Sequence, residues 1–292
     1  MAGASLLVSF GTDMPLHPVV VIGAAYTATE RGLAADVLAA RALGLAPLPL
    51  CTSIVVASGG HVTDVTEVPV DTVNAQLEHL EAIDGIRGVK IGILGSPKTA
   101  IAILDAARQL GGPVVLDIVA SGPSGETVLS ARGIDAVAER LGAADVVTVS
   151  RADAELVTGG EIASLDDAQV AAQRIHNRGA KSVVIRCGAL PYRFYDAADD
   201  PGQTDPEALS ADLFYDGEDF ALFEAPLLPD SPDGAGSVFA LAALAGLIDG
   251  DEPHVALQRA KREATDAVRN AVDVEGLRSR IGLAPITDNN DS

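Results

Sequence analysis

A glycine-rich segment, Pro232-Asp233-Gly234-Ala235-Gly236-Ser237, immediately precedes an apolar helical run that ends at Ile248. Glycines at a helix start allow backbone N–H groups to approach an anion closely, and the helix dipole places about half a positive charge there. The segment therefore favours a phosphate-binding loop formed by Gly234, Ala235 and Gly236. The alternative is a loop whose glycines serve only to make a tight turn.

Asp233 and Ser237 are the residues of this segment whose side chains can move a proton. A serine hydroxyl accepts a proton at neutral pH only when it has a base of its own, so Ser237 alone is a weak acceptor. Asp233, four residues earlier, is a candidate for the missing carboxylate. Its alternative role is to cap the N-terminus of the following helix.

Other groups with chemical potential are scattered along the chain. No Cys/His pair has the spacing of metal ligands, and Cys51 and Cys187 lie so far apart that we expect buried free thiols rather than a disulfide framework. No Ser-His-Asp arrangement is recognisable. Asp117 stands near the end of an apolar run, where a carboxylate either belongs to a site or caps a nearby loop.

Short apolar runs alternate with segments of helical periodicity along most of the chain. Apolar runs of strand length predict parallel strands buried on both faces, and the helical segments between them predict crossover connections. The predicted strands are 19–24, 50–57, 89–94, 113–119, 146–149 and 182–187, and the predicted helices are 29–43, 70–83, 97–110, 131–141 and 165–178. This alternation predicts a doubly wound α/β fold.

The C-terminal third has a different pattern. The apolar runs Asp212–Asp216 and Phe220–Glu224 surround Gly217-Glu218, which predicts a hairpin added at the edge of the sheet. Helices are predicted at about 234–249 and 253–272 from their apolar spacing.

Three further predictions concern the organisation of the chain. The acidic, proline-containing stretch 189–211 predicts an exposed loop, and 285–292 is expected to be a flexible tail. No linker divides the sequence, so we expect a single domain over residues 1–292.

Charge and hydropathy limit the possible partners. Lys plus Arg total 20 against 41 Asp plus Glu, a formal net charge of −21, and so acidic a surface repels the phosphate backbone of nucleic acid. No run approaches the roughly 18 apolar residues of a membrane helix, and the N-terminus lacks the pattern of a secretory signal. We therefore expect a cytoplasmic protein with a small-molecule substrate and neither a nucleic-acid nor a membrane partner.

The order of the motifs resembles that of the hydroxymethylpyrimidine and phosphomethylpyrimidine kinases, a family of the ribokinase-like superfamily related to pyridoxal kinases. The similar segments are Val89–Ser96 (VKIGILGS), Val114–Val119 with Asp117, Ser124-Gly125, the strand ending at Thr148, and Gly234–Ser237, in that succession. The resemblance implies a three-layer α/β/α sandwich with a mostly parallel central sheet and an edge hairpin. It also implies an ATP-dependent kinase that uses Mg²⁺ and forms a homodimer.

The substrate side of the site departs from the family pattern. The resemblance places Gly23, Tyr26, Ser58, Ile93 and Val119 around the substrate. Tyr26 stands where the family has an Asp, and Ser58 stands where it has the Gln that reads the pyrimidine. A site that loses such a buried hydrogen-bonding group loses discrimination between rings.

The nucleotide side keeps the charges of the family and changes several side chains. The resemblance implies that Asp117, Ser150, Asp153, Arg186 and Gly188 hold the nucleotide, with Asp117 and Asp153 next to the Mg²⁺. Arg186 replaces the family Lys, Ser150 replaces an Asn, and Asp153 replaces a Glu with a carboxylate one methylene shorter. Arginine remains a cation there but is bulkier and bidentate.

Ser237 stands where the family has an Asp or a Cys that can accept the proton of the substrate hydroxyl. The candidates for catalysis are therefore Ser237 and its neighbours Asp233, Gly234, Ala235 and Gly236. Phosphoryl transfer depends mainly on positioning and charge neutralisation, so the loss of a base lowers the rate by about 10²–10⁴ without abolishing the reaction.

Two classes of function remain open. The first is ATP-dependent phosphorylation of a hydroxymethyl group on a small heteroaromatic vitamin precursor, namely hydroxymethylpyrimidine or its phosphate in thiamine biosynthesis, with pyridoxal or pyridoxine as the alternative substrate. The second is a ligand-binding homologue that keeps the fold and has lost turnover. The retained glycine loop and Asp117 favour a kinase, whereas Tyr26 and Ser237 favour the second class.

Overall fold

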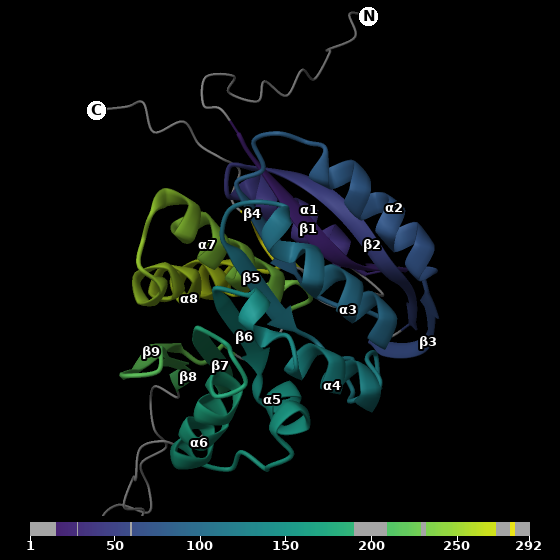
Figure 1. The fold of residues 1–292 in the computed structure, drawn as a ribbon. Helices are drawn as coiled ribbons and strands as arrows, with labels where there is room; N and C mark the ends of the chain where they lie inside the picture. The colour runs from purple at the N-terminus through teal and green to yellow at the C-terminus, as the bar shows by residue number, and fades with distance from the viewer. Residues whose placement is uncertain are drawn as a thin grey trace, which may run out of the picture.

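The computed structural model describes residues 16–27, 29–58, 60–189, 209–228, 232–272 and 281–283. Within them, nine strands form one sheet in the order β3-β2-β1-β4-β5-β6-β7-β8-β9 (Figure 1). The strands are β1 (His17–Tyr26), β2 (Leu45–Ser58), β3 (His61–Glu67), β4 (Gly88–Ile91), β5 (Val114–Ile118), β6 (Val146–Ser150), β7 (Ser182–Gly188), β8 (Leu209–Tyr215) and β9 (Phe220–Pro226).

The centre of the sheet is parallel and its edges are antiparallel. Strands β2, β1, β4, β5, β6 and β7 pair in parallel in that order. Antiparallel β3 extends one edge beside β2, and the β8–β9 hairpin extends the other beside β7. Strands β4 and β5 are buried over their whole length, as parallel strands covered on both faces require.

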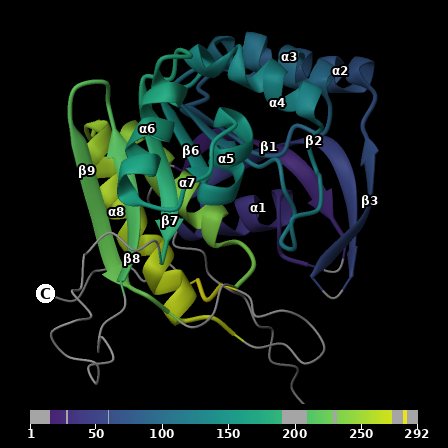
Figure 2. The same ribbon diagram turned by 90° about the horizontal axis from the view of Figure 1, so that it is seen from below.

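Helices cover both faces of the sheet, which makes a three-layer α/β/α sandwich (Figure 2). Side chains of α2 to α6 join Ile22, Ile91 and Leu116 in the core on one face. Side chains of α1, α7 and α8 join Val21 and Val115 in the core on the other. The bounds are α1 (Leu33–Ala42), α2 (Val70–Glu81), α3 (Pro97–Ala106), α4 (Ala131–Ala138), α5 (Arg151–Thr158), α6 (Leu165–His176), α7 (Ala235–Asp249) and α8 (Pro253–Arg269).

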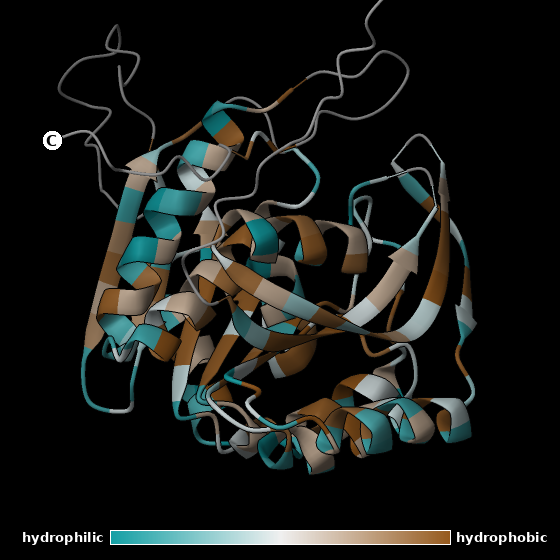
Figure 3. Ribbon diagram, turned by 90° about the horizontal axis from the view of Figure 1, so that it is seen from above, coloured by the Kyte–Doolittle hydropathy of each residue, from teal (hydrophilic) through white to brown (hydrophobic). Residues whose placement is uncertain are grey.

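Helix α7 is apolar on every side. Its residues from Ser237 to Gly246 are all buried, because α1, α8 and the strands β4 and β5 enclose it. Figure 3 shows hydrophobic residues along the central strands, whereas the outer helices alternate hydrophobic and hydrophilic stripes. A helix without a polar face is stable in water only inside such an enclosure. The position of α7 is therefore fixed by its surroundings.

The predicted sandwich, with its mostly parallel sheet and its edge hairpin, is confirmed. The sequence pattern did not predict β3 or α5. Helix α1 begins at Leu33 rather than at residue 29, because Gly32 has a φ of 54° and a ψ of −132°, a conformation that no helix contains.

The loop predicted at 189–211 lies mainly outside the described residues, as does the tail predicted at 285–292. Leu209–Ala211 belong to β8, so that strand begins earlier than expected.

Two expectations from composition can be compared with the structure. Cys51 is half-buried and Cys187 is buried, and both are free thiols. Burial raises the pKa of the Cys187 thiol to about 11, and the nearby Asp212 carboxylate adds to the effect. Among the described residues, no helix is long and apolar enough to cross a membrane.

Truncation of α7 tests how much the fold depends on its enclosure. Leu241 on α7 is fully buried, whereas Leu156 on α5 is 52% exposed. We expect Leu241→Ala to lower the free energy of unfolding by about 2–5 kcal/mol, because it leaves a cavity in a packed core. Leu156→Ala should change it by no more than about 0.5 kcal/mol. Urea unfolding measures both, and equal losses in the two variants would contradict the described packing.

Candidate active site

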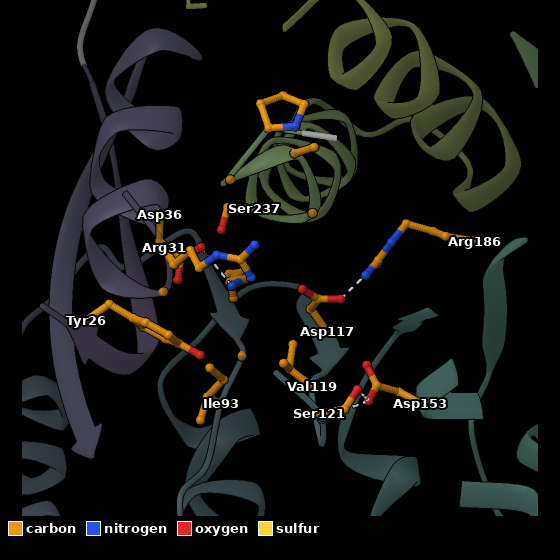
Figure 4. A pocket seen from close by; sticks show the side chains of 17 residues that line it. Tyr26, Arg31, Asp36, Ile93, Asp117, Val119, Ser121, Asp153, Arg186 and Ser237 are labelled. Atoms are coloured by element: carbon orange, nitrogen blue, oxygen red, sulfur yellow. Dashed lines mark hydrogen bonds and ion pairs between the residues drawn. The ribbon is translucent and has the colours of Figure 1, made fainter. Parts of the chain in front are cut away.

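An open pocket of about 330 Å³ lies at the carboxyl ends of the parallel strands, beside the N-terminus of α7 (Figure 4). Its walls come from β1, from α1 and the loop before it, from the segments that end and follow β4 and β5, from α5 and β7, and from the segment that leads into α7 with its first turn. The chain proceeds from β1 to β2 on one side and then to β4 on the other, so the strand order reverses between β1 and β4. Ligands bind at such switch points in open parallel sheets.

The N-terminus of α7 presents backbone donors to the pocket. Gly234 precedes the helix with a φ of 98°, and a Cβ there would lie 3.0 Å from Ile281 Cδ1, so this position requires glycine. The N–H groups of Ala235, Gly236 and Ser237 belong to the first turn, whose donors lack intrahelical partners. The first turn carries no acidic side chain. This end of α7 therefore favours an anion.

A hydrogen-bonded ion pair faces this turn from the ends of β5, β6 and β7. Asp117 Oδ1 accepts hydrogen bonds from Thr148 Oγ1 at 2.7 Å and from Arg186 Nη1 at 2.8 Å. Burial opposes the charge of Arg186, but the carboxylates of Asp117, Asp212 and Asp153 together outweigh it and raise the pKa of the guanidinium. The Arg186 guanidinium carbon also lies 5.9 Å from the centre of the Phe239 ring on α7.

The glycine turn and the ion pair are separated by a narrow space. A Cβ built on Gly236 would lie 3.5 Å from Arg186 Nη2 and 3.7 Å from Asp117 Oδ2. Within the described ranges, no hydrogen bond reaches Asp117 Oδ2. A ligand between the two would therefore meet N–H donors on one side and both a cation and a carboxylate oxygen on the other.

Asp153 anchors the segment that follows β5. Ser150 caps α5: its hydroxyl accepts a hydrogen bond from Asp153 N at 3.1 Å and donates one to Asp153 Oδ2 at 2.8 Å. Asp153 Oδ1 accepts from Ala120 N at 3.2 Å, Ser121 N at 2.9 Å and Ser121 Oγ at 2.7 Å. Asp153 thereby fixes this wall of the pocket, in addition to lining it.

A second buried ion pair lines the pocket on the side of α1. Lys90 Nζ on β4 donates to Asp36 Oδ1 on α1 at 2.7 Å, and their side chains are 3% and 0% exposed. Gly92 leaves room for the ammonium group, since a Cβ there would lie 2.9 Å from Lys90 Nζ. Burial raises the pKa of Asp36, although the Lys90 charge and the Ser237 hydroxyl act in the opposite direction. Ser237 thus lies beside this pair.

Asp233 neither caps α7 nor lines the pocket. The residue at the cap position is Gly234, so the predicted capping role of Asp233 is wrong. The Asp233 carboxylate accepts a hydrogen bond from Thr29 Oγ1 at 2.9 Å and forms an ion pair with Arg31 at 2.5 Å. These contacts join the loop before α1 to the loop before α7, and they place Arg31 on the pocket wall. A role for Asp233 as a base stays a prediction.

Tyr26, Ile93 and Val119 also line the pocket, with Tyr26 near Arg31 and Val119 beside Asp117 (Figure 4). Burial raises the pKa of Tyr26 to about 12, with Arg31 opposing the shift and Asp233 adding to it. The Tyr26 phenol is therefore a neutral hydrogen-bonding group at physiological pH. The two aliphatic side chains beside it offer an apolar surface.

The pocket brings together most of the residues predicted from the sequence. It is lined by Tyr26, Ile93, Asp117, Val119, Asp153, Arg186, Gly234, Ala235, Gly236 and Ser237. The other predicted residues do not line it. Gly23 lies in β1 next to Asp36, Ser150 caps α5, and Gly188 ends β7. Ser58 is exposed at the end of β2.

Several residues of the wall were missed. They are Arg31, Gly32, Asp36, Lys90, Gly92, Ser121 and Pro232. For Lys90 a signal existed, because a lysine inside an apolar strand that is buried on both faces needs a partner. No comparable signal marked Arg31 or Ser121, whose positions depend on contacts with Asp233 and Asp153.

The three-layer sandwich, with a glycine turn before a buried helix and a pocket at the strand ends, is the ribokinase-like architecture. The profile of the phosphomethylpyrimidine kinase family matches residues 29–281, and the chain belongs to this family. The family resemblance expected from the order of motifs is thereby confirmed.

Individual relatives agree with this assignment. A hydroxymethylpyrimidine/phosphomethylpyrimidine kinase of Aquifex aeolicus is 30% identical over 243 residues, which cover 82% of this chain and 89% of the relative. The structure of a pyridoxal kinase from Staphylococcus aureus with AMP-PCP and pyridoxal is similar with a TM-score of 0.78 at 27% identity, over 92% of this chain and 94% of that one. A phosphomethylpyrimidine kinase from Clostridium difficile 630 shares the fold, with a TM-score of 0.70 at 21% identity over 86% and 99% of the two chains.

Removal of the Asp153 carboxylate should release the segment after β5. We expect Asp153→Ala to speed amide exchange at Ser121 by at least about tenfold, because its N–H loses its acceptor. As a matched control, Asp167→Ala removes a carboxylate that accepts from Ser164 N outside the pocket and should leave Ser121 unchanged. Hydrogen-exchange NMR checks both variants. Equal protection of Ser121 in wild type and Asp153→Ala would show that Asp153 does not hold this segment.

Proposed function

We propose that this chain transfers the terminal phosphoryl group of ATP to the hydroxymethyl group of a small heteroaromatic vitamin precursor, hydroxymethylpyrimidine or its phosphate, in thiamine biosynthesis. The observation that carries the proposal is the position of the α7 N–H groups opposite the Asp117–Arg186 pair. Membership of the phosphomethylpyrimidine kinase family supports it, as does the name of the Aquifex aeolicus relative.

The phosphates of ATP are proposed to lie against the first turn of α7. There the N–H groups of Ala235, Gly236 and Ser237 gain the acceptors that the helix cannot supply. The Arg186 side chain is 21% exposed and faces the same space, so it can pair with a phosphate while Asp117 holds it. Phosphoryl transfer requires mainly positioning and stabilisation of charge, which such fixed donors provide. In the Staphylococcus aureus relative the bound AMP-PCP is an analogue of ATP.

Asp117 fits a Mg²⁺ ion better than Asp153 does. Mg²⁺ commonly binds one or two carboxylates together with substrate phosphates and water, so it needs no all-protein cage. Asp117 Oδ2 accepts no hydrogen bond from the described residues, whereas Asp153 Oδ1 already accepts three and Oδ2 one. No group of three or more potential ligands for a metal ion occurs in the part of the chain that the structure describes. The ion would therefore arrive with the nucleotide and neutralise its phosphates.

The ring of the substrate is proposed to lie against Tyr26, Ile93 and Val119. This wall combines an aromatic face, aliphatic contacts and a neutral phenol, which suits a small heteroaromatic ring. Ser58, which occupies the position of the family's pyrimidine-reading Gln, is exposed and outside the pocket. Specificity for the ring must therefore depend on side chains such as Tyr26 and Arg31.

Pyridoxal or pyridoxine is the second candidate substrate. The observation that favours it is the likeness to the Staphylococcus aureus enzyme, whose structure contains pyridoxal. A ligand-binding homologue without turnover is the third reading, because Ser237 replaces the usual proton acceptor. The homodimer and the cytoplasmic location expected from the sequence stay predictions.

Substitution of Gly236 tests where the nucleotide binds. A Cβ at Gly236 meets no atom closer than 3.5 Å, so Gly236→Val should fold, yet its side chain would occupy the space proposed for the phosphates. We expect the dissociation constant of ATP with Mg²⁺ to rise more than about tenfold. Gly142→Val is a matched control outside the pocket, since a Cβ there also has its nearest neighbour at 3.5 Å. If calorimetry shows the same affinity for ATP in Gly236→Val as in the wild type, the nucleotide does not bind at this turn.

A turnover assay separates the three readings. Purified protein is incubated with ATP, Mg²⁺ and one ring alcohol at a time, and ADP and the phosphorylated ring are quantified. We expect the highest kcat/KM with hydroxymethylpyrimidine or its phosphate. A higher value with pyridoxal or pyridoxine would assign the second substrate class. Binding of nucleotide without turnover of any ring alcohol would leave the ligand-binding homologue as the correct reading.

A further inference from the structure

The buried pair of Asp36 and Lys90 is a feature of the pocket that nucleotide and ring binding do not explain. Both residues line the pocket, and neither belongs to the Asp117–Arg186 pair that is proposed to meet the phosphates. A buried charge is costly unless it is paired and hydrogen-bonded. The pair therefore needs either a structural or a chemical reason.

Three elements bring this pair to Ser237. Asp36 lies in the first turn of α1, Lys90 lies on β4, and Ser237 lies in the first turn of α7. The three residues are 0%, 3% and 8% exposed. Helix α1 packs against α7, and Asp36 and Ser237 both line the pocket. The Ser237 hydroxyl favours the ionised form of the Asp36 carboxyl. Ser237, which stands at the position of the family's proton acceptor, thus has the Asp36 carboxylate as a neighbour on the side of α1.

Only one oxygen of the Asp36 carboxylate has a hydrogen-bond partner among the described residues. Lys90 Nζ donates a hydrogen bond to Asp36 Oδ1 at 2.7 Å. Asp36 Oδ2 is buried and has no hydrogen-bond partner among the described residues, so the contact with Ser237 is not a formed hydrogen bond in this conformation. A serine hydroxyl can turn its hydrogen towards a free acceptor.

A purely structural pair does not explain the free oxygen. Buried polar atoms in folded proteins almost always have partners, and a stabilising ion pair repays its desolvation only when the remaining lone pairs are also bonded. Apart from Lys90, Ser237 is the hydrogen-bonding side chain of the described residues that acts on the Asp36 carboxylate. The nearest atom that a Cβ on Gly23 of β1 would meet is Asp36 Oδ2, at 3.6 Å, so the strand residue nearest to it on that side carries no side chain.

We propose that Asp36 is the terminal proton acceptor behind Ser237. The proposal rests on the phosphoryl transfer proposed above. Ser237 is the group that touches the substrate hydroxyl, and Asp36 acts through it. Lys90 holds the carboxylate in place through the opposite oxygen.

The transfer balances with ATP as the other reactant. The substrate oxygen forms a bond to the γ-phosphorus, and the bond from that phosphorus to the β,γ-bridging oxygen breaks, with its electron pair leaving on ADP. The proton of the substrate hydroxyl passes to Ser237 Oγ, and the proton of Ser237 passes to Asp36 Oδ2. When the products leave, Asp36 returns its proton to solvent and Ser237 is unchanged.

The charges that face Asp36 suit this role. Burial raises the pKa of its carboxyl, Lys90 on β4 and Ser237 on α7 oppose the shift, and Asp117 on β5 adds to it. An acceptor works best when its pKa approaches the working pH. Asp36 is therefore a stronger base than an exposed aspartate.

Kinetics of single and double variants test the relay. We expect Asp36→Asn and Ser237→Ala each to lower kcat by about 10² or more, with little change in KM or in ATP affinity. The double variant should be no slower than the slower single one, because both remove the same relay. Asp145→Asn, which removes a carboxylate paired with Lys181 outside the pocket, should keep wild-type kcat. Multiplicative losses in the double variant, or wild-type kcat in Asp36→Asn, would overturn the proposal.

Asp36→Asn leaves the Lys90 charge buried without its partner. If that variant does not fold, Asp36→Asn combined with Lys90→Met removes both charges and takes its place. Thermal unfolding of each variant precedes the kinetics. A folded double-neutral variant with wild-type kcat would equally overturn the proposal.

A titration without substrate separates this proposal from the proposed function. The ¹³C resonance of the Asp36 carboxyl is assigned by its loss in Asp36→Asn and followed against pH in the free protein. We expect Ser237→Ala to raise its midpoint, because a hydroxyl that stabilises the charged form is lost. An unchanged midpoint overturns the contact whatever the activity. A raised midpoint in a protein that phosphorylates no ring alcohol keeps the contact but refutes the proposed function, and the proton transfer with it.

Discussion

Two buried carboxylates, each held by a single cation, set the charge and shape of the pocket. Arg186 holds Asp117 through one oxygen, and Lys90 holds Asp36 through one oxygen. Each carboxylate keeps a second oxygen without a partner among the described residues. An unpaired buried oxygen such as Asp36 Oδ2 is costly, so it is expected where a ligand or a proton completes it. Both pairs line the same pocket as Ser237, so the reacting groups would meet within reach of all of them.

Helix α7 connects this chemistry to the fold. Its apolar faces bury it between α1, α8 and the sheet, which leaves it little freedom to shift along the pocket. Its bare N-terminus is thereby held opposite Asp117 and Arg186. The contacts of Asp233 with Thr29 and Arg31 join the loop before α7 to the loop before α1. A change in the packing of α7 would thus move the phosphate turn and the substrate wall together.

The sequence predicted the parallel strands well because a strand buried on both faces must be apolar throughout. It did not reveal β3, an edge strand whose residues His61–Glu67 are mostly polar and exposed, or α5, which is short and depends on the Ser150 cap. Of the residues that line the pocket, the sequence analysis named Asp117, Arg186 and the glycine turn. Asp36 and Arg31 were missed, since their roles arise from partners that lie far away in sequence. Only the tertiary structure shows that Asp233 forms an ion pair with Arg31. It also shows that Ser58 does not line the pocket.

The central claim is that the first turn of α7 and the Asp117–Arg186 pair hold the phosphates of a nucleotide in line with a ring hydroxyl beside Ser237. A crystal structure of the protein with AMP-PCP, Mg²⁺ and hydroxymethylpyrimidine tests it most directly. The account predicts the terminal phosphate against the N–H groups of Ala235 to Ser237, and the ring hydroxyl within hydrogen-bond distance of Ser237 Oγ. Phosphates bound away from this turn, or a ring whose hydroxyl points away from Ser237, would contradict it.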